Sequence, residues 1–356
     1  MCALVQLSYV VNPNLMFRNY VYRSSSSESI PRHFSEFARY VHSNYLLSSK
    51  NLIVEVGSND GTLLSAFKQL GCKVLGVDPA ENLARVAKAR GVETIPEFFN
   101  AKVAQKILEK SGPARVVIGT NVFAHIDDLH DFMDGVTALL QDEGILSIEV
   151  PYLGDLNQNV EYDTIYHEHL SYFSIQPIER LFSAHGMQLE SVARLQVHGG
   201  SIRVIGKKTN RKSKRHALIE LEKRSGLDKL ETYRTLAYRV EYQKEYLKHM
   251  LEAIKSKGQR IIGYGAPAKG NTMLNVCDIG TETLDYLIDT TPEKIGKFTP
   301  GKHVPIFETA KFRRERPPYA LMLAWNYQEE ILMKERDYIG QFINPIPYPR
   351  VLSRIA

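Results

Sequence analysis

The sequence predicts an α/β fold made of two domains that are joined by a long helix. The chain has 356 residues, enough for roughly two domains of ~150 residues each. From residue 51 onward, short β-branched or apolar runs alternate with helical stretches, and the same alternation restarts near residue 259. Strands that alternate with helices favour parallel sheets with crossover helices.

Composition narrows the class of protein. Apolar residues make up 44% and charged residues 24%, which is typical of soluble globular proteins, and the 45 basic and 40 acidic residues leave a net charge of +5. This mild excess suits an anionic ligand without requiring a polyanion, so we expect no nucleic-acid partner. No apolar run reaches about 18 residues, and we expect no membrane partner either. The scattered Cys2, Cys72 and Cys277 predict a reducing cytoplasm and no bound metal.

The first part of the chain is divided into an arm and a domain. Residues 1–45 are rich in Tyr, Ser and Asn and are expected to form an arm with a helix from about Ser29. Residues 46–208 form the first predicted domain. Its parallel strands, with a closing antiparallel pair named last, are expected at Leu52 to Val56, Val74 to Val77, Val116 to Gly119, Ile145 to Val150, Gln188 to Leu195 and Ser201 to Ile205.

The second part begins with a helical linker, residues 209–258. The basic run from Lys207 to Arg215 is typical of a solvated connection, with a nucleic-acid patch as the alternative. Apolar residues then recur at helical spacing from Leu230 to Ile254, as expected for a helix that packs between domains or subunits, so a monomer and a homodimer both stay open. A smaller α/β domain follows at 259–356. Its strands are expected at Arg260 to Gly263, Leu284 to Asp289 and Tyr319 to Ala324.

A glycine turn follows the first strand and is the most informative motif. Glu55 ends an apolar strand, and Gly57, Asn59 and Gly61 form the turn before a helix. Glycine lets a ligand approach the backbone, and the helix N-terminus adds amide donors. The loop departs from the dinucleotide fingerprint G-x-G-x-x-G, because Asn59 stands at the middle glycine. An acid before a short glycine turn resembles S-adenosylmethionine-dependent methyltransferases instead, although an ordinary strand-helix corner is the structural alternative.

Three further residues extend this cofactor hypothesis. Asp78 is expected at the end of the second strand, where a carboxylate accepts hydrogen bonds from ribose hydroxyls. After the next long strand, the segment containing Asn121 and His125 is similar to the part of these enzymes that lines the methionine moiety. For His125, a place at a helix start without a ligand role is the alternative.

A run of polar side chains from Tyr166 to His169 follows the next strand, at the face where a substrate would meet the methyl group. Histidine suits a general base because its ordinary pKa is ~6.5. His167 and His169 could instead share a metal, but no third ligand is evident, and one of them could be a buried structural histidine.

Several motifs together resemble the nucleotide-sugar C-methyltransferases of deoxysugar biosynthesis. The resemblance spans nearly the whole chain, and the motifs that carry it are Tyr22 to Ser25, Glu55 to Gly61, Asp163 to His169, His198 to Arg203 and Gly263 to Gly270. It implies a class I methyltransferase Rossmann-like domain, a long helix and a second, smaller Rossmann-like α/β domain that helps to hold the nucleotide. The implied activity is S-adenosylmethionine-dependent methyl transfer to a carbon beside the keto group of a nucleoside-diphosphate sugar, usually a thymidine-diphosphate sugar.

The resemblance also implies roles for individual residues. His169 becomes the general base, and Tyr166 and Glu168 orient the sugar. Tyr20 or Tyr22 closes over the site, with simple anchoring of the arm as the alternative. The residues expected to bind the substrate are His198, Ser201, Arg203, Gly265, Lys269 and Asn326.

The C-terminal loop leaves other activities open. Gly263, Gly265 and Ala268 match the G-x-G-x-x-A fingerprint, and Asp289 follows at a strand end, so a nicotinamide-dependent oxidoreductase is the alternative enzyme. A purely structural turn and a nucleotide-sugar-binding protein that has lost catalysis are further alternatives. The family that the chain resembles usually begins with a cysteine-ligated zinc module; we expect the arm, with Cys2, to be a remnant of it that binds no zinc.

Overall fold

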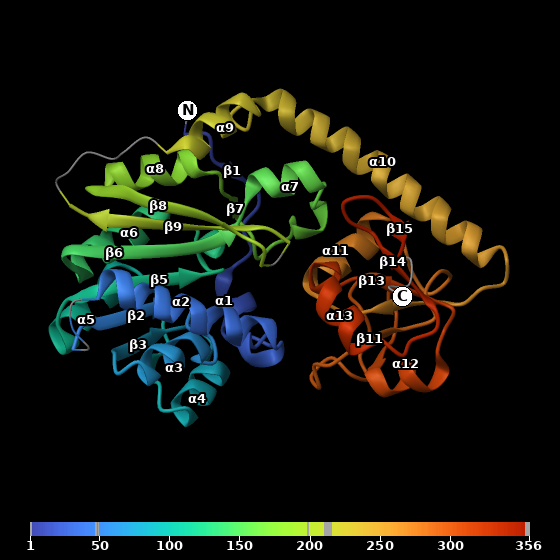
Figure 1. Ribbon diagram of the computed structural model, residues 1–356, viewed down its shortest axis with the longest axis horizontal. Helices are drawn as coiled ribbons and strands as arrows, with labels where there is room; N and C mark the ends of the chain where they lie inside the picture. Colours follow the sequence, from blue (N-terminus) through green and yellow to red (C-terminus); the bar gives the residue numbers. More distant parts are fainter. Residues whose placement is uncertain (1, 47, 49, 198, 210–215, 353–356) are drawn as a thin grey trace. The chain divides into compact units, whose positions relative to one another are not determined.

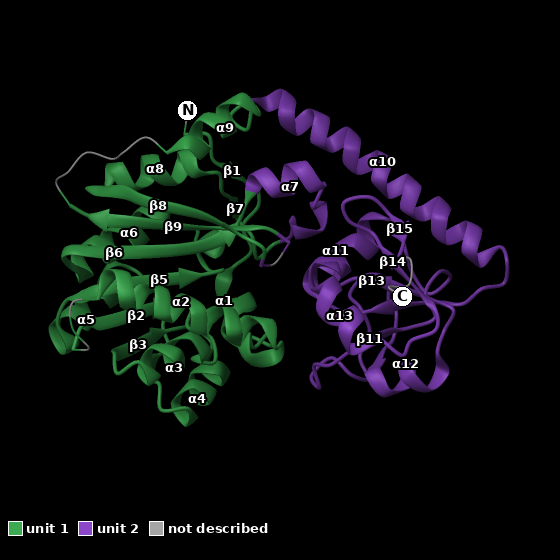
Figure 2. Cartoon of the chain, in the orientation of Figure 1, with its two compact units in different colours: residues 1–152, 167–196, 200–228 green, residues 153–166, 197–199, 229–356 purple. Residues whose placement is uncertain are grey.

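The computed structural model describes residues 2–46, 48, 50–197, 199–209 and 216–352. The chain forms two compact units (Figure 2). Unit 1 comprises residues 1–152, 167–196 and 200–228, and unit 2 comprises residues 153–166, 197–199 and 229–356. Two short segments inside the first predicted domain, 153–166 and 197–199, therefore pack with the C-terminal part of the chain. The linker predicted at 209–258 is divided at residue 228.

Unit 1 is built on a seven-stranded sheet whose order is β4-β3-β2-β5-β6-β9-β8 (Figure 1). The strands are β2 (Leu52–Val56), β3 (Lys73–Val77), β4 (Thr94–Ile95), β5 (Ala114–Thr120), β6 (Leu140–Pro151), β8 (Met187–Leu195) and β9 (Ser201–Lys208). The first five strands of this order are parallel, and β9 runs antiparallel to both β6 and β8. The predicted parallel sheet with an antiparallel closing pair is confirmed.

Helices cover both faces of this sheet. They are α2 (Ser29–Tyr45), α3 (Thr62–Gln69), α4 (Glu81–Ala89), α5 (Ala101–Ser111), η2 (Phe123–His125), α6 (Leu129–Leu139), α8 (Ile175–Ala184) and α9 (Ala217–Arg224). On β2, Val54 packs in a core with α5, α6 and α8, whereas its neighbour Ile53 packs with α2 and α3. Side chains alternate between the faces of a strand, so apolar residues at consecutive positions produce a sheet that is buried on both faces.

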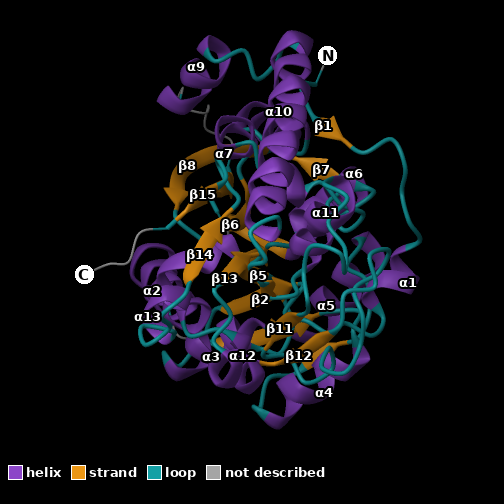
Figure 3. Ribbon diagram, turned by 90° about the vertical axis from the view of Figure 1, so that its right-hand side faces the viewer, coloured by secondary structure: helices purple, strands orange, loops and turns teal. Residues whose placement is uncertain are grey.

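The N-terminal arm contains β1 (Val5–Gln6), α1 (Pro13–Phe17) and η1 (Ser24–Ser26). β1 pairs antiparallel with β7 (Ser171–Tyr172), and the two lie side by side in Figure 3. The backbone N–H of Leu7 donates to the carbonyl of Leu170 at 2.9 Å. These two-residue strands were not predicted, because they are too short for an alternating pattern. The arm is thus tied to the chain directly after His169.

Unit 2 contains a smaller sheet with the order β12-β11-β10-β13-β14-β15, in which only β15 is antiparallel to its neighbour. Its strands are β10 (Ile261–Tyr264), β11 (Leu287–Asp289), β12 (Ile306–Glu308), β13 (Tyr319–Met322), β14 (Gln341–Asn344) and β15 (Arg350–Val351). Its helices are α7 (Leu153–Asn159), η3 (Tyr162–Thr164), α10 (Leu230–Lys255), α11 (Ala268–Val276), α12 (Thr309–Glu315), η4 (Trp325–Tyr327) and α13 (Gln328–Lys334). The second α/β domain that the sequence predicts is confirmed.

The long helix α10 is confirmed, but its apolar stripe is buried only in part. Leu247 and Leu251 are fully buried, whereas Leu230, the first residue of the helix, is 64% exposed. Among the described residues, no helix is both long and apolar enough to span a membrane.

One buried carboxylate caps a helix in unit 1. The N-cap residue of α8, Ser174, makes no side-chain cap bond. Glu222, on α9, accepts hydrogen bonds instead from the backbone N–H groups of Ile175 (2.7 Å) and Gln176 (3.2 Å) and from the Tyr152 hydroxyl (3.1 Å). A carboxylate is favourable here, because the first amides of a helix have no partner within the helix.

We expect Glu222→Ala to lower the free energy of unfolding by about 1–3 kcal/mol, since it leaves these buried donors without an acceptor. The midpoint of urea denaturation measures the change. Glu220→Ala, on the same helix in an exposed pair with Lys223, should change it by less than about 0.5 kcal/mol. Equal effects of the two variants would contradict the capping role.

Candidate active site

The turn after β2 depends on its glycines. Gly57 has φ +68° and Gly61 has φ +75°, a region that side chains rarely adopt. A Cβ at Gly57 would lie 2.8 Å from the side chain of Val122. The backbone N–H of Gly57 donates to the carbonyl of Val77 at 2.8 Å, which joins the turn to the end of β3. This turn therefore brings backbone close to the carboxyl edge of the sheet with little room for side chains.

Glu55 lies buried at the start of this turn, with 2% of its surface exposed. One carboxyl oxygen, Oε1, accepts a long hydrogen bond of 3.4 Å from Thr120. The other, Oε2, has no partner among the described residues. Burial raises the pKa of Glu55 well above its ordinary value, and the nearby Asp78, Asp60 and Glu149 raise it further. A cationic ligand that hydrogen-bonds to Oε2 would satisfy both the charge and the orphaned oxygen.

Asp78 follows β3 and is 7% exposed. Its two oxygens accept hydrogen bonds from the backbone N–H groups of Asn59 and Ala80, each at 2.8 Å. Burial raises the pKa of Asp78 in spite of these bonds. Because a carboxylate oxygen can accept more than one hydrogen bond, Asp78 retains the capacity to bind hydroxyl groups. Asp78 lies at the predicted strand end, beside the glycine turn, and ribose binding by this acid stays a prediction.

The side chain of Asn59 is engaged with the N-terminal arm. Its Oδ1 accepts from the backbone N–H of Ser24 at 3.0 Å, and its Nδ2 donates to the carbonyl of Tyr22 at 3.1 Å. Asn59 was predicted to bind the cofactor, yet both ends of its amide bind protein. Asn121, in the corresponding position after β5, has φ +54°, and its backbone N–H donates to the carbonyl of Glu149 at 2.8 Å.

The ring of the predicted base, His169, is part of a stack of three rings. His125 lies parallel to Phe17 with a centroid distance of 5.4 Å, and His169 stacks on His125 at 5.3 Å. Burial, together with the nearby His169, lowers the pKa of His125 to about 3. His125 is therefore neutral and is placed to support the imidazole of His169. A contact between His125 and the cofactor stays a prediction.

The segment that contains Glu168 and His169 is held on both sides within unit 1. The Tyr20 hydroxyl donates to Glu168 Oε2 at 2.7 Å, and the backbone N–H of Leu170 donates to the carbonyl of Ala124 at 2.8 Å. Burial raises the pKa of Glu168, and the hydrogen bond from Tyr20 opposes that rise. The exposed His167 faces the ring of Tyr9 at 6.2 Å.

Of the two tyrosines predicted in the arm, Tyr20 binds Glu168 of this segment, and Tyr22 is 41% exposed. Tyr166 belongs to unit 2, where it is half-buried. Across the described part of the chain, no cluster of three or more His, Cys, Asp or Glu side chains is arranged to hold a metal ion.

Arg203 is part of a buried ion network. Its guanidinium approaches Glu149 Oε1 at 2.5 Å, and His33 Nε2 lies 2.8 Å from the other oxygen of the same carboxylate. Burial alone would raise the pKa of Glu149, but His33 and Arg203 lower it below its ordinary value. The guanidinium also lies 3.8 Å above the ring of Phe37. Arg203, predicted to bind the substrate, is thus engaged within the fold.

Two other residues of this motif, Ser201 and His198, were predicted to bind the substrate. Ser201 is fully buried as the first residue of β9, and His198 lies outside the described residues.

In unit 2, a buried charge cluster follows β10. The Lys269 Nζ has no hydrogen-bond partner among the described residues and lies 4.5 Å from the centre of the Trp325 ring. Trp325 Nε1 donates to Asp163 at 2.7 Å, and burial raises the pKa of Asp163. Burial also raises the pKa of Glu161 to about 7, while Lys269 opposes this rise.

The loop that carries Lys269 turns at Gly265, which has φ +87° and would place a Cβ 2.9 Å from that of Ala324. Asn326 is half-buried in η4, directly after Trp325. The structure thus gathers Lys269, a predicted substrate residue, with the side chains of Glu161, Asp163 and Trp325.

Asp289, the acid of the nicotinamide alternative, is engaged inside unit 2. Its carboxylate accepts from the backbone N–H groups of Ala266 and Thr291, each at 2.8 Å, and pairs with Lys294 at 3.4 Å. Burial would raise its pKa, but Lys294 and these amides lower it. A ribose would have to compete with an internal cation for this carboxylate.

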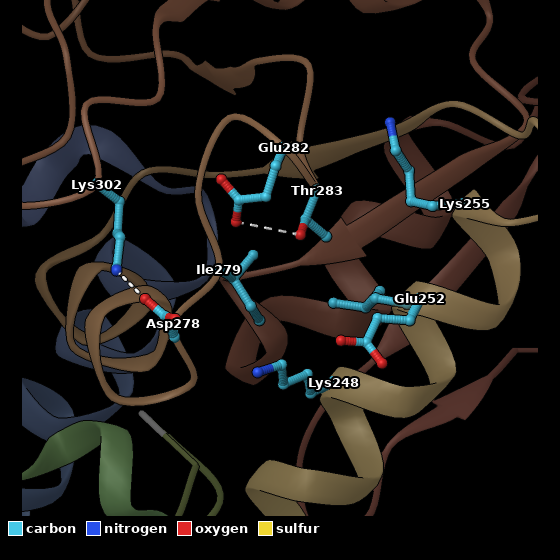
Figure 4. A pocket seen from close by; sticks show the side chains of 9 residues that line it. Lys248, Glu252, Lys255, Asp278, Ile279, Glu282, Thr283 and Lys302 are labelled. Carbon is cyan, nitrogen blue, oxygen red and sulfur yellow. Dashed lines mark hydrogen bonds and ion pairs between the residues drawn. The ribbon is translucent and has the colours of Figure 1, made fainter.

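A pocket of about 390 Å³ lies in unit 2, away from these residues (Figure 4). It is lined by α10 and by loops that contain Asp278, Glu282 and Lys302, and the Lys302 ammonium pairs with Asp278. The pocket contains none of the residues that the sequence predicts for cofactor or substrate.

Sequence reasoning missed Glu149, Asp60 and Asn82, which organise the neighbourhood of the site. Asp60 is fully buried and accepts from the Ser25 hydroxyl at 2.5 Å, and Asn82 binds the backbone of Tyr20. A signal for Asp60 was available, because a second acid within the glycine turn has to find a partner when it is buried. Nothing in the sequence pattern distinguishes Asn82 from other polar residues at a helix start.

Two family models match the chain. The model described as a methyltransferase domain covers residues 31–192, and the model described as a C-methyltransferase C-terminal domain covers residues 196–347. The C-methyltransferase NovU of Streptomyces niveus is 40% identical over 359 aligned residues, which cover 99% of this chain and 86% of NovU. A ubiquinone biosynthesis O-methyltransferase of Bartonella bacilliformis is 25% identical over 97 residues, covering 27% of this chain and 39% of that protein.

Solved structures show more distant similarity. Magnesium protoporphyrin IX methyltransferase from Synechocystis PCC 6803 with bound SAH has a TM-score of 0.40 and 14% identity, covering 50% of this chain and 82% of that chain. A SAM-dependent methyltransferase from Archaeoglobus fulgidus has a TM-score of 0.42 and 12% identity, covering 50% and 94%. The family assignment rests on the sequence matches.

The Glu149 network predicts that Arg203→Met destabilises the protein in a pH-dependent way. With Arg203, the lowered pKa of Glu149 contributes stability above its unfolded pKa, and this contribution is lost only as the pH falls through the folded pKa. Without Arg203, Glu149 keeps only His33 as a partner, so its pKa is lowered less, and the penalty for the poorly compensated carboxylate is relieved on acidification. We expect a loss of about 3 kcal/mol at pH 8 and a smaller loss at pH 5.5 in urea denaturation.

Lys207→Met is the matched control, because Lys207 is on the same strand and pairs with the exposed Glu143. It should cost less than about 1 kcal/mol at either pH. If Arg203→Met is as stable as the parent, the structural role of Arg203 is refuted, and its predicted role in substrate binding is favoured again.

Proposed function

Because this chain belongs to the S-adenosylmethionine-dependent C-methyltransferases, we propose that it methylates the carbon beside the keto group of a nucleoside-diphosphate deoxysugar. Thymidine diphosphate is the nucleotide we expect. The observation that carries the proposal is the hydrogen bond between Tyr20 and Glu168. It lies next to His169, whose ring stacks on that of His125. A carboxyl group and an imidazole in one short segment are the groups needed to bind a keto sugar and remove its proton.

The cofactor fits the residues around the glycine turn. S-adenosylmethionine carries a cationic amino group and a sulfonium, and when bound it supplies an electrophilic methyl group. Glu55, with its orphaned buried oxygen, is suited to the cationic amino group, and Asp78 to the ribose hydroxyls. Gly57 and Gly61 allow the positive φ angles of the turn and its close packing, and Asn121 and His125 lie on the segment after β5. For Asn59 we propose a contact through the backbone, since its side chain binds the arm.

Methylation at carbon first requires a carbanion equivalent. The C–H bond beside the sugar ketone breaks, its proton passes to the imidazole of His169, and its electron pair forms an enolate. The enolate carbon then forms a bond to the methyl group while the methyl–sulfur bond breaks and its electrons remain on sulfur. The chain contributes the base, the alignment and the stabilisation of the enolate oxygen. A neutral His125 beneath His169 adds no like charge when the latter becomes an imidazolium.

Glu168 orients the sugar in this proposal. Tyr20 binds its Oε2, so Oε1 is the oxygen expected to face a sugar hydroxyl or the keto oxygen. Burial raises the pKa of Glu168, and the hydrogen bond from Tyr20 opposes this rise. Tyr166, two residues earlier, is proposed to act on the same sugar, and Tyr22 is assigned to the arm.

Unit 2 is proposed to hold the nucleotide. The loop with Gly265 leads into α11, whose first amides and Lys269 suit a diphosphate. Asn326 is a further proposed contact of this unit, whereas substrate binding by Ser201 and His198 stays a prediction, and Arg203 is assigned to Glu149 instead.

We expect His169→Gln to lower kcat for methylation by about 10²- to 10⁴-fold, because the base is lost while the segment keeps a polar side chain. The affinity for S-adenosylmethionine, measured by calorimetry, should stay within about twofold. His167→Gln, two residues earlier and exposed, is the control and should retain turnover. Unchanged turnover of His169→Gln would refute the assignment of the base.

Proton removal can be separated from methyl transfer. With S-adenosylhomocysteine in place of the methyl donor, the protein should exchange the hydrogen beside the ketone of a thymidine-diphosphate keto-deoxyhexose for deuterium from D₂O. Mass spectrometry should detect one deuterium per sugar with the parent protein and background exchange with His169→Gln. Sugar binding without exchange and without methylation would identify a nucleotide-sugar-binding protein that has lost catalysis.

A further inference from the structure

We propose that Asn82 is a positioning residue that, together with Asn59, fixes the strap, defined as residues 17–25, so that the Tyr20 hydroxyl meets Glu168. The inference rests on the proposed function only in taking Glu168 to be a substrate-orienting group. It assigns a task to Asn82, which lies on α4 and was not among the predicted site residues.

The strap has little regular structure of its own. It begins at the last residue of α1 and ends in η1, and residues 18–23 between them belong to no helix or strand. Such a segment cannot satisfy its backbone groups internally, so its path depends on partners elsewhere in unit 1. Those partners are side chains that can be identified one by one.

Asn82 binds both backbone groups of a single strap residue. Its Oδ1 accepts from the N–H of Tyr20 at 3.1 Å, and its Nδ2 donates to the carbonyl of Tyr20 at 2.8 Å. A carboxamide that both accepts from and donates to one residue fixes the orientation of that peptide, as a neighbouring strand would. The Tyr20 side chain then extends to Glu168, with its hydroxyl at 2.7 Å.

Asn59 does the same for the next part of the strap, through the N–H of Ser24 and the carbonyl of Tyr22. A third attachment follows at Ser25, whose hydroxyl donates to the buried Asp60 at 2.5 Å and accepts from Arg90 at 3.0 Å. The attachments at Asn82, Asn59 and Asp60 hold successive strap residues. Only the attachment at Asn82 acts directly on Tyr20.

These attachments come from segments next to the residues that we expect to hold the cofactor. Asn59 belongs to the glycine turn, and its own N–H donates to Asp78. Asn82 lies near the start of α4, four residues beyond Asp78. The strap therefore connects the glycine turn and the start of α4 to Glu168, and the alignment of Glu168 depends on residues that do not touch the sugar.

A double-mutant cycle tests the proposal. Tyr20→Phe, Asn82→Ala and the double variant are assayed for methylation of a thymidine-diphosphate keto-deoxyhexose, with calorimetry for S-adenosylmethionine and a thermal midpoint for each protein. We expect about a tenfold lower kcat for either single variant, cofactor affinity within about twofold, and a double variant no slower than Tyr20→Phe alone. The non-additive result is specific to a residue that acts through Tyr20.

Asn44→Ala is the matched control, because Asn44 is an exposed helical asparagine that binds only a backbone carbonyl of its own helix; it should leave kcat unchanged. Multiplying effects in the double variant, or an Asn82→Ala variant with parental kcat, would overturn the proposal. Because Tyr20→Phe removes only a hydroxyl, it keeps the cycle interpretable if Asn82→Ala folds poorly. Glu168→Gln and the parent separate the two levels: no methylation by the parent refutes the proposed function, and parental turnover of Glu168→Gln refutes the orienting role of Glu168. Impaired Glu168→Gln with normal Asn82→Ala refutes only the positioning role.

Discussion

Four carboxyl groups are buried at the carboxyl edge of the sheet in unit 1, and their need for compensation organises the site. Glu55, Asp60, Asp78 and Glu149 are each 7% exposed or less. An isolated ionised carboxylate cannot be buried without a large cost, so each must be paired, hydrogen-bonded or protonated. The partners of each carboxyl show which groups maintain the fold and which are suited to bind a ligand.

Two of the four are compensated within the chain. Glu149 pairs with Arg203 and His33, and Asp60 with Arg90 and the Ser25 hydroxyl. Glu55 and Asp78 form no ion pair with a described residue; Asp78 receives two backbone amides, and Glu55 keeps an orphaned oxygen. The uncompensated pair lies beside the glycine turn, where a cationic cofactor would supply the missing charge. The hydrogen bond from the Ser25 hydroxyl to Asp60 also holds the arm. Asp60 therefore takes part both in charge compensation and in the attachment of the arm.

The sequence predicted the sheets well because their signal is local. The strand predicted at residues 52–56 is observed with the same bounds, since a short apolar run between turns, interrupted here only by Glu55, identifies a strand buried on both faces. Arg203 shows where such reasoning ends. Its motif suggests a ligand contact, but Glu149 lies directly opposite on β6 in the antiparallel register, and the two residues are 54 positions apart. That pairing depends on the register between distant strands, which residue types alone do not determine. The strap attachments at Asn59 and Asn82 are equally non-local.

The buried cluster of unit 2 places a condition on the proposed nucleotide site. Two carboxyls, Glu161 and Asp163, share the single buried cation of Lys269, and burial raises the pKa of both. If both were ionised, the cluster would be negative and would repel a diphosphate. With the pKa of Glu161 at about 7, protonation of this carboxyl near neutral pH brings the cluster close to zero charge. An arriving diphosphate favours that protonated state, since it draws on the charge of Lys269. If the nucleotide binds at this loop as proposed, we expect its binding to be coupled to proton uptake by Glu161.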